Sequence, residues 1–441
     1  MSKKTSGNVM HAEHHSRPVR WSIMQRADDP DVSRANRQLK EDIANGATGV
    51  AIIFEGAHNA FGFGLPARDD TIEQLFNGIH LDGLHIRLDN HPHGRALTDK
   101  FIDYLQKKRI DPARTRITFG TDPVATLATT GRLKMSIAAL KASLPQSMSA
   151  FFSSGLPGIV LEADGRPYHN AGATQAQEIG AMLSVVRGHL NMVEEGRHHV
   201  AYALPHIGFA TSLDQNPALG LAKLHALRLL WRRLQEECGI ANPFPAAIHV
   251  ETSMRMMTRR DVMANAIRIT SASFAAISGG AVSLSVLPYS IPLGLPDATA
   301  RRQARNCQLV FAIENEPGTV QQLKQPPPET NNLAEAAWEE YQRFEKEGGV
   351  LQSLIDGSLV RRFNEARDLR VTAFIKGEYS IVGTTQSRLE IQEPVSIYDQ
   401  KPSPFQPEGI VHCKPLSFKR LDTSFEEAAL NAPADAARIV S

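Results

Sequence analysis

Histidine, carboxylate and tyrosine side chains stand at the ends of several apolar stretches in this chain. In a closed barrel of parallel strands, residues at the carboxyl ends of the strands carry the chemistry. The candidates at such positions are Glu55, His58, Asp89, His91, Asp122, Tyr168, His169, His206, His249 and Glu251. Imidazoles and carboxylates together can hold a divalent ion that activates water. None of these residues forms a tight metal-binding motif, so the sequence assigns no metal site.

A further motif is D-x-H-x-x-G, formed by residues 89–94 with His91 at its centre. In this pattern the histidine becomes the lower axial ligand of cobalamin cobalt, and the aspartate orients its other ring nitrogen. Three fixed positions recur by chance in a chain of this length. The other features of a cobalamin module, a Ser-x-Leu after the next strand and a later Gly-Gly, are not found at suitable places. We therefore interpret the match as accidental.

The elements that must position these residues alternate between strand and helix. Around the central stretch we expect a strand over Ile248–Val250, a helix over Thr258–Ala276, a strand over Ala281–Leu287 and a helix over Ala298–Glu314. Strands are expected at 47–54, 85–89, 116–119, 157–162, 201–204, 248–250 and 281–287, with 308–313 as an eighth candidate. This count favours an α/β fold closed into a (β/α)₈ barrel of the TIM type, with an open doubly wound sheet as the alternative.

The two ends of the chain differ in composition from the barrel. Residues 1–20 are polar and His-rich and predict a flexible arm. The first helix after the arm is expected over Ser33–Asn45, with Ser33 as its N-cap. Residues 21–388 form the expected barrel, and residues 389–441 a Pro-rich, irregular C-terminal tail.

The amino-acid composition limits the classes of function that this chain can have. The 441 residues are 42% hydrophobic, and 48 Lys and Arg balance 47 Asp and Glu. We therefore expect a globular protein with no electrostatic attraction to nucleic acid or to a membrane surface. Three distant cysteines give no disulfide framework, and no run of about 18 apolar residues occurs. These features predict a cytoplasmic protein.

Segments spread over nearly the whole barrel resemble, in order, the methylmalonyl-CoA mutase family. Four of them lie between residues 248 and 318, and the other three flank this central stretch. The matching segments are His249-x-Glu-Thr-Ser253, Arg260–Arg268, the Gly-Gly and Ser-Leu of 279–284, Ala300–Gln308, Asn170–Thr174 with Gln177–Glu178, Lys223–Trp231, and Ala337–Trp338 with Glu345–Gly349. The resemblance implies a (β/α)₈ barrel that threads CoA, and rearrangement of methylmalonyl-CoA to succinyl-CoA by adenosylcobalamin radicals. It places cobalamin on a C-terminal domain, which we do not expect in this sequence.

Three positions depart from the pattern of catalytic members. Their Gln-Tyr-Ala, with the tyrosine over the substrate, is Gln-Arg26-Ala here, and their Tyr-His pair aligns with Arg166 and Pro167. Tyr168 and His169 resemble that pair but fall two residues late. The family segment His-x-Gln-Thr-Ser is His249-Val-Glu251-Thr-Ser here, which places a carboxylate where an amide would face an anionic ligand. No catalytic or cofactor-binding residue is therefore assigned, and Tyr168, His169, His249 and Glu251 are kept as degenerate candidates.

The resemblance and these departures predict the small, non-catalytic subunit of a heterodimeric mutase in propionate metabolism. Its partner would be the catalytic large subunit, acyl-CoA is a candidate ligand, and adenosylcobalamin would act in the complex without being bound by this chain alone. Two alternatives stay open. The chain is an active acyl-CoA mutase barrel that uses a cobalamin domain on a separate chain, or it is an independent acyl-CoA-binding or metal-dependent hydrolase barrel.

Overall fold

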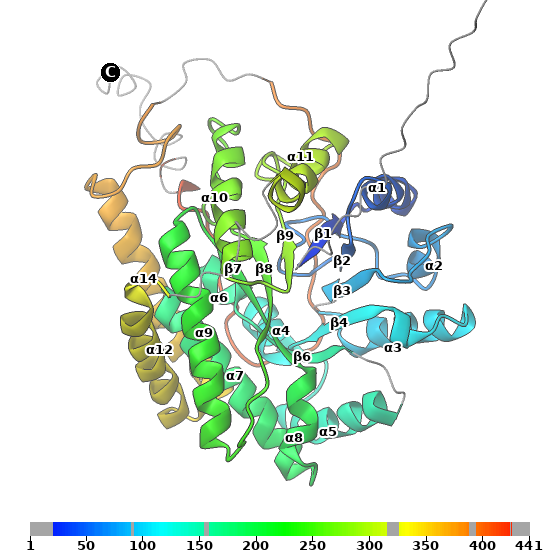
Figure 1. The fold of residues 1–441 in the computed structure, drawn as a ribbon. Helices are drawn as coiled ribbons and strands as arrows, with labels where there is room; N and C mark the ends of the chain where they lie inside the picture. Colours follow the sequence, from blue (N-terminus) through cyan, green and yellow to red (C-terminus); the bar gives the residue numbers. More distant parts are fainter. Residues whose placement is uncertain are drawn as a thin grey trace, which may run out of the picture.

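Eight parallel strands close into a barrel at the centre of the molecule (Figure 1). The computed structural model describes residues 21–89, 92–153, 158–314, 326–387, 394–423 and 425. In barrel order the strands are β1 (Ser22–Ala27), β2 (Gly49–Ile53), β3 (His85–Asp89), β4 (Arg116–Thr121), β6 (Ile159–Asp164), β7 (Ile207–Leu213), β8 (Ala247–Thr252) and β9 (Ser283–Ser285). β1 pairs with β2 and with β9, which closes the sheet. The closed barrel is confirmed, and the open sheet is wrong.

Helices cover the outside of the barrel. They are α1 (Val32–Ala44), α2 (Thr71–Leu75), α3 (Arg95–Lys107), α4 (Pro123–Thr130), α5 (Ile137–Ser153), α6 (Arg166–Ala171), α7 (Gln175–Glu195), α8 (Val200–Ala203), α9 (Pro217–Glu237), α10 (Ala264–Ser278) and α11 (Ala298–Leu309). Three further helices, α12 (Glu329–Lys346), α13 (Gly349–Ile355) and α14 (Ser358–Ile375), follow the last strand. α12 packs against α7 and α9 as an additional outer layer (Figure 1).

Several predicted elements differ from the structure. The strand predicted at 201–204 is wrong: Ala201–Ala203 lie in α8, and β7 begins only at Ile207. The candidate strand at 308–313 is also wrong, because α11 continues into a π-helical turn, Val310–Glu314. The helix expected from Thr258 begins at Ala264. The N-cap of α1 is Asp31, whose side chain accepts a hydrogen bond from the backbone N–H of Arg34, and not Ser33.

The tail crosses the face of the barrel at the carboxyl ends of the strands. A two-residue strand, β10 (Ile410–Val411), pairs antiparallel with β5 (Arg132–Leu133), the residues that follow α4. Phe405 packs so closely on Gly56 that a Cβ at Gly56 would lie 2.7 Å from its ring. The N-terminal arm and residues 388–393 lie outside the described residues.

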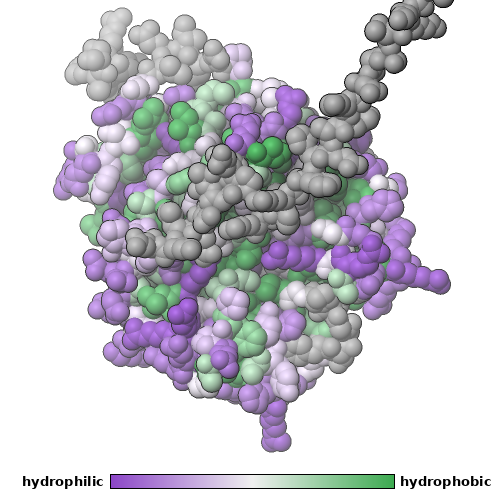
Figure 2. All heavy atoms as spheres, viewed as in Figure 1, coloured by the Kyte–Doolittle hydropathy of each residue, from purple (hydrophilic) through white to green (hydrophobic). Residues whose placement is uncertain are grey.

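Apolar side chains gather on the surface near α10 and α11. Ile267 and Ile313 are about three-quarters exposed. Phe274 and Val310 are partly exposed beside them, and Figure 2 shows hydrophobic surface in this region, towards the top of the view. Surfaces of this kind mark sites of protein contact.

Candidate functional site

Charged side chains fill the interior of the barrel. Because side chains alternate along a strand, His85, Arg87 and Asp89 of β3 lie on one face of the sheet. The charged residues that meet in the interior are Arg26, Arg87, Asp89, Glu162, Asp164, Arg166 and Glu251, and each is at most 5% exposed. We call this group, together with Asn59, the interior network.

Arg26 joins β1 to β8. Its Nη1 donates to Oε2 of Glu251 at 2.9 Å, and its Nε donates to Oδ2 of Asp28 at 3.0 Å. Its Nη2 donates to the carbonyl oxygen of Asn59 at 2.6 Å. Asp28 also pairs with Arg301 of α11 at 2.7 Å. Burial would raise the pKa of Asp28, but the two guanidinium groups lower it to about 2, so it stays ionised.

Arg166, the first residue of α6, contacts carboxylates of three strands, β3, β6 and β8. It donates to both oxygens of Asp89, at 2.7 and 3.2 Å, and to both oxygens of Asp164, at 2.7 and 2.9 Å. Its Nη1 also lies 3.8 Å from Oε2 of Glu251. Burial opposes the charge on Arg166, but Asp164 and Asp89 hold its pKa well above the ordinary value. Arg166 is therefore a permanent cation inside the barrel.

Arg87 and Glu162 lie next to this group and pair in a bidentate arrangement. Nη1 and Nη2 of Arg87 donate to the two oxygens of Glu162 at 2.8 and 2.6 Å, and its Nε donates to Asp89 at 3.1 Å. Paired forks of this kind are the strongest and most directional ion pairs in proteins. The interior network therefore continues from β1 to β6 through side chains that are bonded to one another.

The loop after β2 covers the network at the carboxyl ends of the strands. Asn59 is fully buried, and its Nδ2 donates to both Asp89 and Glu251 at 3.0 Å. The ring of Phe61 lies over Arg26, with the guanidinium carbon 5.6 Å from its centroid. His58, from the same loop, lies 2.9 Å from Asp164 through its Nε2. This loop separates the charges from the space above them.

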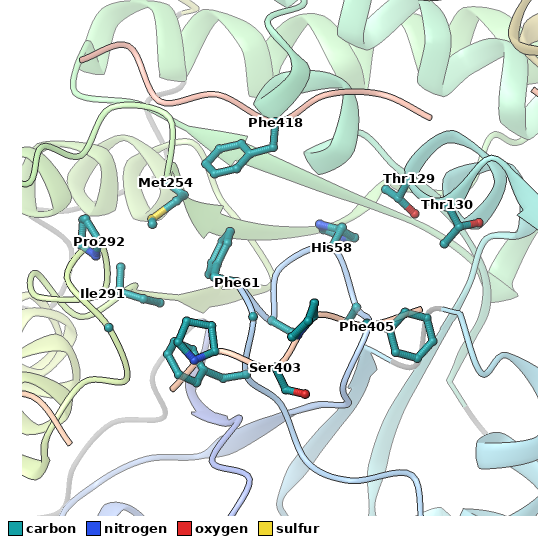
Figure 3. Close-up of a pocket in the computed structure, with 18 of the residues that line it drawn as sticks. His58, Phe61, Thr129, Thr130, Met254, Ile291, Pro292, Ser403, Phe405 and Phe418 are labelled. Carbon is teal, nitrogen blue, oxygen red and sulfur yellow. The ribbon is translucent and has the colours of Figure 1, made fainter. Parts of the chain in front are cut away.

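That space is a pocket of about 620 Å³ at the barrel mouth (Figure 3). The loop after β2 supplies one wall, with Phe61, and the tail residues 402–418 supply another, with Phe405 and Phe418. Met254 and Ile291 project into it from the loops after β8 and β9. Its lining is mainly apolar, which suits a hydrophobic ligand or a packed tail and offers few groups for acid–base chemistry.

A second cavity, of about 200 Å³, opens at the opposite end of the barrel. His249 lines it and is bonded through Nδ1 to the hydroxyl of Ser283 at 2.8 Å. Burial, and then the charges of Arg87 and Arg166, hold the pKa of His249 well below its usual value, so it is neutral. His206 lines the same cavity; it precedes β7, so its predicted place at the carboxyl end of a strand is wrong.

Tyr168 and His169 lie outside the interior network. Tyr168 is fully buried against Phe363 of α14, with ring centroids 5.8 Å apart. The imidazole of His169 bridges Glu178 of α7 at 3.1 Å and the hydroxyl of Ser253 at 2.8 Å. Burial and the charge of Arg255 lower the pKa of His169 to about 4. The pair that resembles the catalytic Tyr-His therefore belongs to the packing between barrel and helices.

The remaining candidates have local partners. Glu55 accepts from the backbone N–H of Ala67, and Asp122 caps α4 while accepting from the N–H of Asp164. Burial raises the pKa of Asp122 to about 7. His91 lies outside the described residues. Within the described residues, no three His, Cys, Asp or Glu side chains are grouped to hold a metal, and no helix is long and apolar enough to span a membrane.

Sequence reasoning missed Arg87, Glu162, Asp164 and Asn59. A signal was available for one of them, because His85-Ile-Arg87-Leu-Asp89 alternates polar and apolar residues within a strand expected to be buried. The structure brings together Asp89, Arg166 and Glu251 from the predicted or aligned positions, and leaves His169 apart.

The sequence of this chain is similar to known proteins over most of its length. The family model for methylmalonyl-CoA mutase matches residues 8–438. The chain is 30% identical over 421 residues to a methylmalonyl-CoA mutase small subunit of Streptomyces virginiae, covering 93% of this chain and 64% of that one. It is 31% identical over 366 residues to a probable small subunit of Mycobacterium tuberculosis, covering 76% of this chain and 57% of that one.

The large subunit of the Streptomyces enzyme is also similar, at 24% identity over 446 residues, covering 94% of this chain and 60% of that one. This chain thus spans about three fifths of the length of these curated relatives. The match of the family model over nearly the full sequence decides the assignment: the chain belongs to the methylmalonyl-CoA mutase family.

Proposed function

We propose that this chain is a non-catalytic, small-subunit-like component that supports isomerisation of methylmalonyl-CoA to succinyl-CoA by a catalytic large subunit in the cytoplasm. One observation carries the proposal. Arg26, Arg166 and Glu251 stand at the three positions that depart from catalytic members, and they meet in one buried ion-paired group. The positive charges of Arg26 and Arg166 are therefore compensated in part by the negative charge of Glu251. The three departures form one group and are not three unrelated losses of catalytic residues.

The network occupies the space through which a substrate would pass. Asn59 covers it from the carboxyl ends of the strands, and the Arg87–Glu162 pair lies between Asp89 and the opposite cavity. Removing one partner of a buried ion pair costs about 3–5 kcal/mol, because the other charge is left without compensation. A CoA thioester threading this barrel would have to displace several such pairs.

The described residues do not fit adenosylcobalamin against the barrel interior. Phe61 and Phe418, which both line the mouth pocket, pack against each other with ring centroids 6.1 Å apart, and Asn59 covers the charges beneath. The imidazole that lines this pocket, His58, is directed to Asp164 and lies 2.9 Å from it (Figure 3). We therefore propose that the cofactor acts in the partner.

The partner is proposed from the relatives and from the surface. Two of the relatives above are named small subunits, at 30% and 31% identity, and the large subunit of the Streptomyces enzyme is 24% identical. The exposed Ile267 and Ile313 on and beside α10 offer an apolar surface for contact.

The test is to co-express the chain with the large subunit encoded in the same genome. Size-exclusion chromatography with light scattering measures the complex, and succinyl-CoA formation measures turnover. We expect a one-to-one complex whose turnover is unchanged by Tyr168→Phe in this chain and abolished by removing cobalamin from the partner. Turnover by this chain mixed with a cobalamin-binding protein that has no mutase barrel would instead identify an active split enzyme. Turnover by this chain without the large subunit and without a cobalamin-binding protein would identify an independent barrel.

A further inference from the structure

A strongly basic cavity of about 210 Å³ lies between α14, the end of α6 and the tail, and none of its lining residues belongs to the interior network. Its walls are α14, the turn at Gly172 that ends α6, and tail residues 419–421. Five of its ten lining residues are arginine or lysine, and one is acidic. The chain as a whole is nearly neutral, so this concentration of positive charge is local.

Arg255 forms the inner wall of the cavity. It is 3% exposed, and its Nη1 donates to the carbonyl oxygens of His169 and Ala173 at 2.8 and 3.1 Å. Its Nη2 pairs with Asp214 at 3.0 Å. Its Nε is buried and has no hydrogen-bond partner among the described residues. Arg255 is therefore held rigidly and retains an unused donor.

Arg370 and Arg367 come from consecutive turns of α14. Among the described residues, Arg370 donates to two backbone carbonyl oxygens, those of Gly172 at 3.2 Å and Ala173 at 3.5 Å. Burial, and then the nearby charge of Arg255, lower its pKa to about 10. Arg367 pairs with Asp368 through Nε at 3.2 Å, while its buried Nη1 has no partner among the described residues. Asp214, which pairs with Arg255, acts to raise the pKa of Arg370 and offsets this repulsion only in part, since the pKa of Arg370 stays below its ordinary value. An anion in the cavity would offset the remainder.

Lys419 completes the cavity at its rim. It is exposed, and the backbone N–H of Lys419 is tied to the carbonyl of Asn170, which holds the tail beside α6. Cationic donors therefore reach the cavity from the barrel loop, from α14 and from the tail. Donors converging from three sides suit a tetrahedral anion better than a planar carboxylate, and guanidinium groups are the preferred ligands of phosphate.

We propose that this cavity binds the phosphate group of a small anionic ligand. The site is separate from the interior network and does not depend on the proposed subunit role. Gly172 supports it structurally: its φ is +108°, and an added Cβ would lie 2.5 Å from Cβ of Arg367, so only glycine lets α14 approach this closely.

The probe is inorganic phosphate, titrated into the full chain against sodium chloride at matched ionic strength. Thermal unfolding and isothermal calorimetry report binding. We expect a saturable rise in Tm with phosphate. Arg367→Gln should weaken phosphate affinity about tenfold, because a charge-assisted hydrogen bond is removed. Lys419→Gln gives an independent, exposed variant if Arg367→Gln folds poorly, and it should weaken affinity as well.

Arg361→Gln is the matched control, because Arg361 is an exposed arginine on the same helix. It should leave phosphate affinity unchanged. The proposal is overturned if phosphate raises Tm no more than chloride does, or if Arg367→Gln and Lys419→Gln bind phosphate as the unaltered chain does. A response to malonate without one to phosphate would also overturn it, because the site would then select a dicarboxylate.

Discussion

Nη1 of Arg26 lies 2.9 Å from Oε2 of Glu251, although 225 residues separate the two in sequence. Both side chains are almost fully buried. A cation at one position is tolerated here because an anion stands at the other. The ion pair links two positions that differ from catalytic members of the family and that look independent in the sequence. It also connects β1 to β8.

Glu251→Gln should destabilise the chain by about 3 kcal/mol, because Arg26 and Arg166 lose a buried counter-charge. The free energy of unfolding in urea measures the effect. Glu73→Gln is the control: Glu73 is exposed and pairs with Lys108 at the surface, so no measurable change is expected.

Replacing both members of the pair, Arg26→Met with Glu251→Met, should restore part of the stability that Glu251→Met loses alone. Removing both charges removes the pair as a unit, whereas removing Glu251 alone leaves Arg26 without one of its counter-charges, and the restoration is partial because Asp28 and Arg166 each lose a partner in the double variant. Additive losses in this double-mutant cycle would show that the two side chains are not coupled.

Asn59→Ala should destabilise the chain by about 2 kcal/mol and open the cover of the interior network, because Asp89 and Glu251 both lose a buried donor. Hydrogen exchange of residues 54–65 should rise. Asn77→Ala, in an exposed turn, is the matched control. Unchanged exchange in Asn59→Ala would mean that the loop is held by other contacts.

His189 gives a pH-dependent prediction. It is fully buried in α7, neither ring nitrogen has a partner among the described residues, and burial lowers its pKa from 6.5 to about 4. The unfolded chain therefore takes up a proton below about pH 6.5 that the folded chain does not, so stability falls as the pH is lowered from 6.5 towards 4.

At pH 5 this one group should cost about 2 kcal/mol relative to pH 7.5. His189→Leu removes the group, so its stability relative to the unaltered chain should increase by that amount between pH 7.5 and pH 5. Urea unfolding at the two pH values measures the difference. If the free energies of unfolding of His189→Leu and the unaltered chain differ by the same amount at pH 7.5 and at pH 5, the pKa of His189 is the same in the folded and the unfolded chain.

Phe405→Ala should loosen the tail over the barrel mouth, because its ring packs on Gly56 and edge-on against His93 with centroids 5.5 Å apart. Limited proteolysis should then cut within residues 394–418 faster than in the unaltered chain. Tyr202→Ala removes an exposed aromatic ring on α8 and should leave the cleavage rate unchanged. Equal rates in both variants would show that other contacts hold the tail.

Local patterns predicted the barrel but not all of its strands. β3 was placed correctly, because its apolar residues alternate visibly. β1 was missed, since Gln25 and Arg26 are polar and their partners, Asp42 and Glu251, lie in other elements. The strand that corresponds to β7 was predicted too early in the sequence, because small residues interrupt the apolar run of β7 itself. Gly208 is required there, since a Cβ would lie 2.7 Å from Ile159.

The site was predictable only in part, for a related reason. Sequence comparison identified Arg26, Arg166 and Glu251 as departures, and a carboxylate in place of an amide looked like a loss. Only the three-dimensional arrangement places the three side chains together, because charge compensation depends on contacts between distant strands. Asn59 gave no signal, since its role depends on how its loop folds over the mouth.

The pairing of β1 with β9 sets an order of events during synthesis. Met24 of β1 pairs in register with Ser285 of β9. One edge of β1 therefore stays unpaired until β9, the last strand of the barrel, has left the ribosome. At roughly 5–20 residues per second, that interval is on the order of tens of seconds. For most of this time Glu251, the partner of Arg26, has not been synthesised either. A nascent chain with an open sheet edge and an unpaired charge is exposed to non-native pairing, which chaperones prevent.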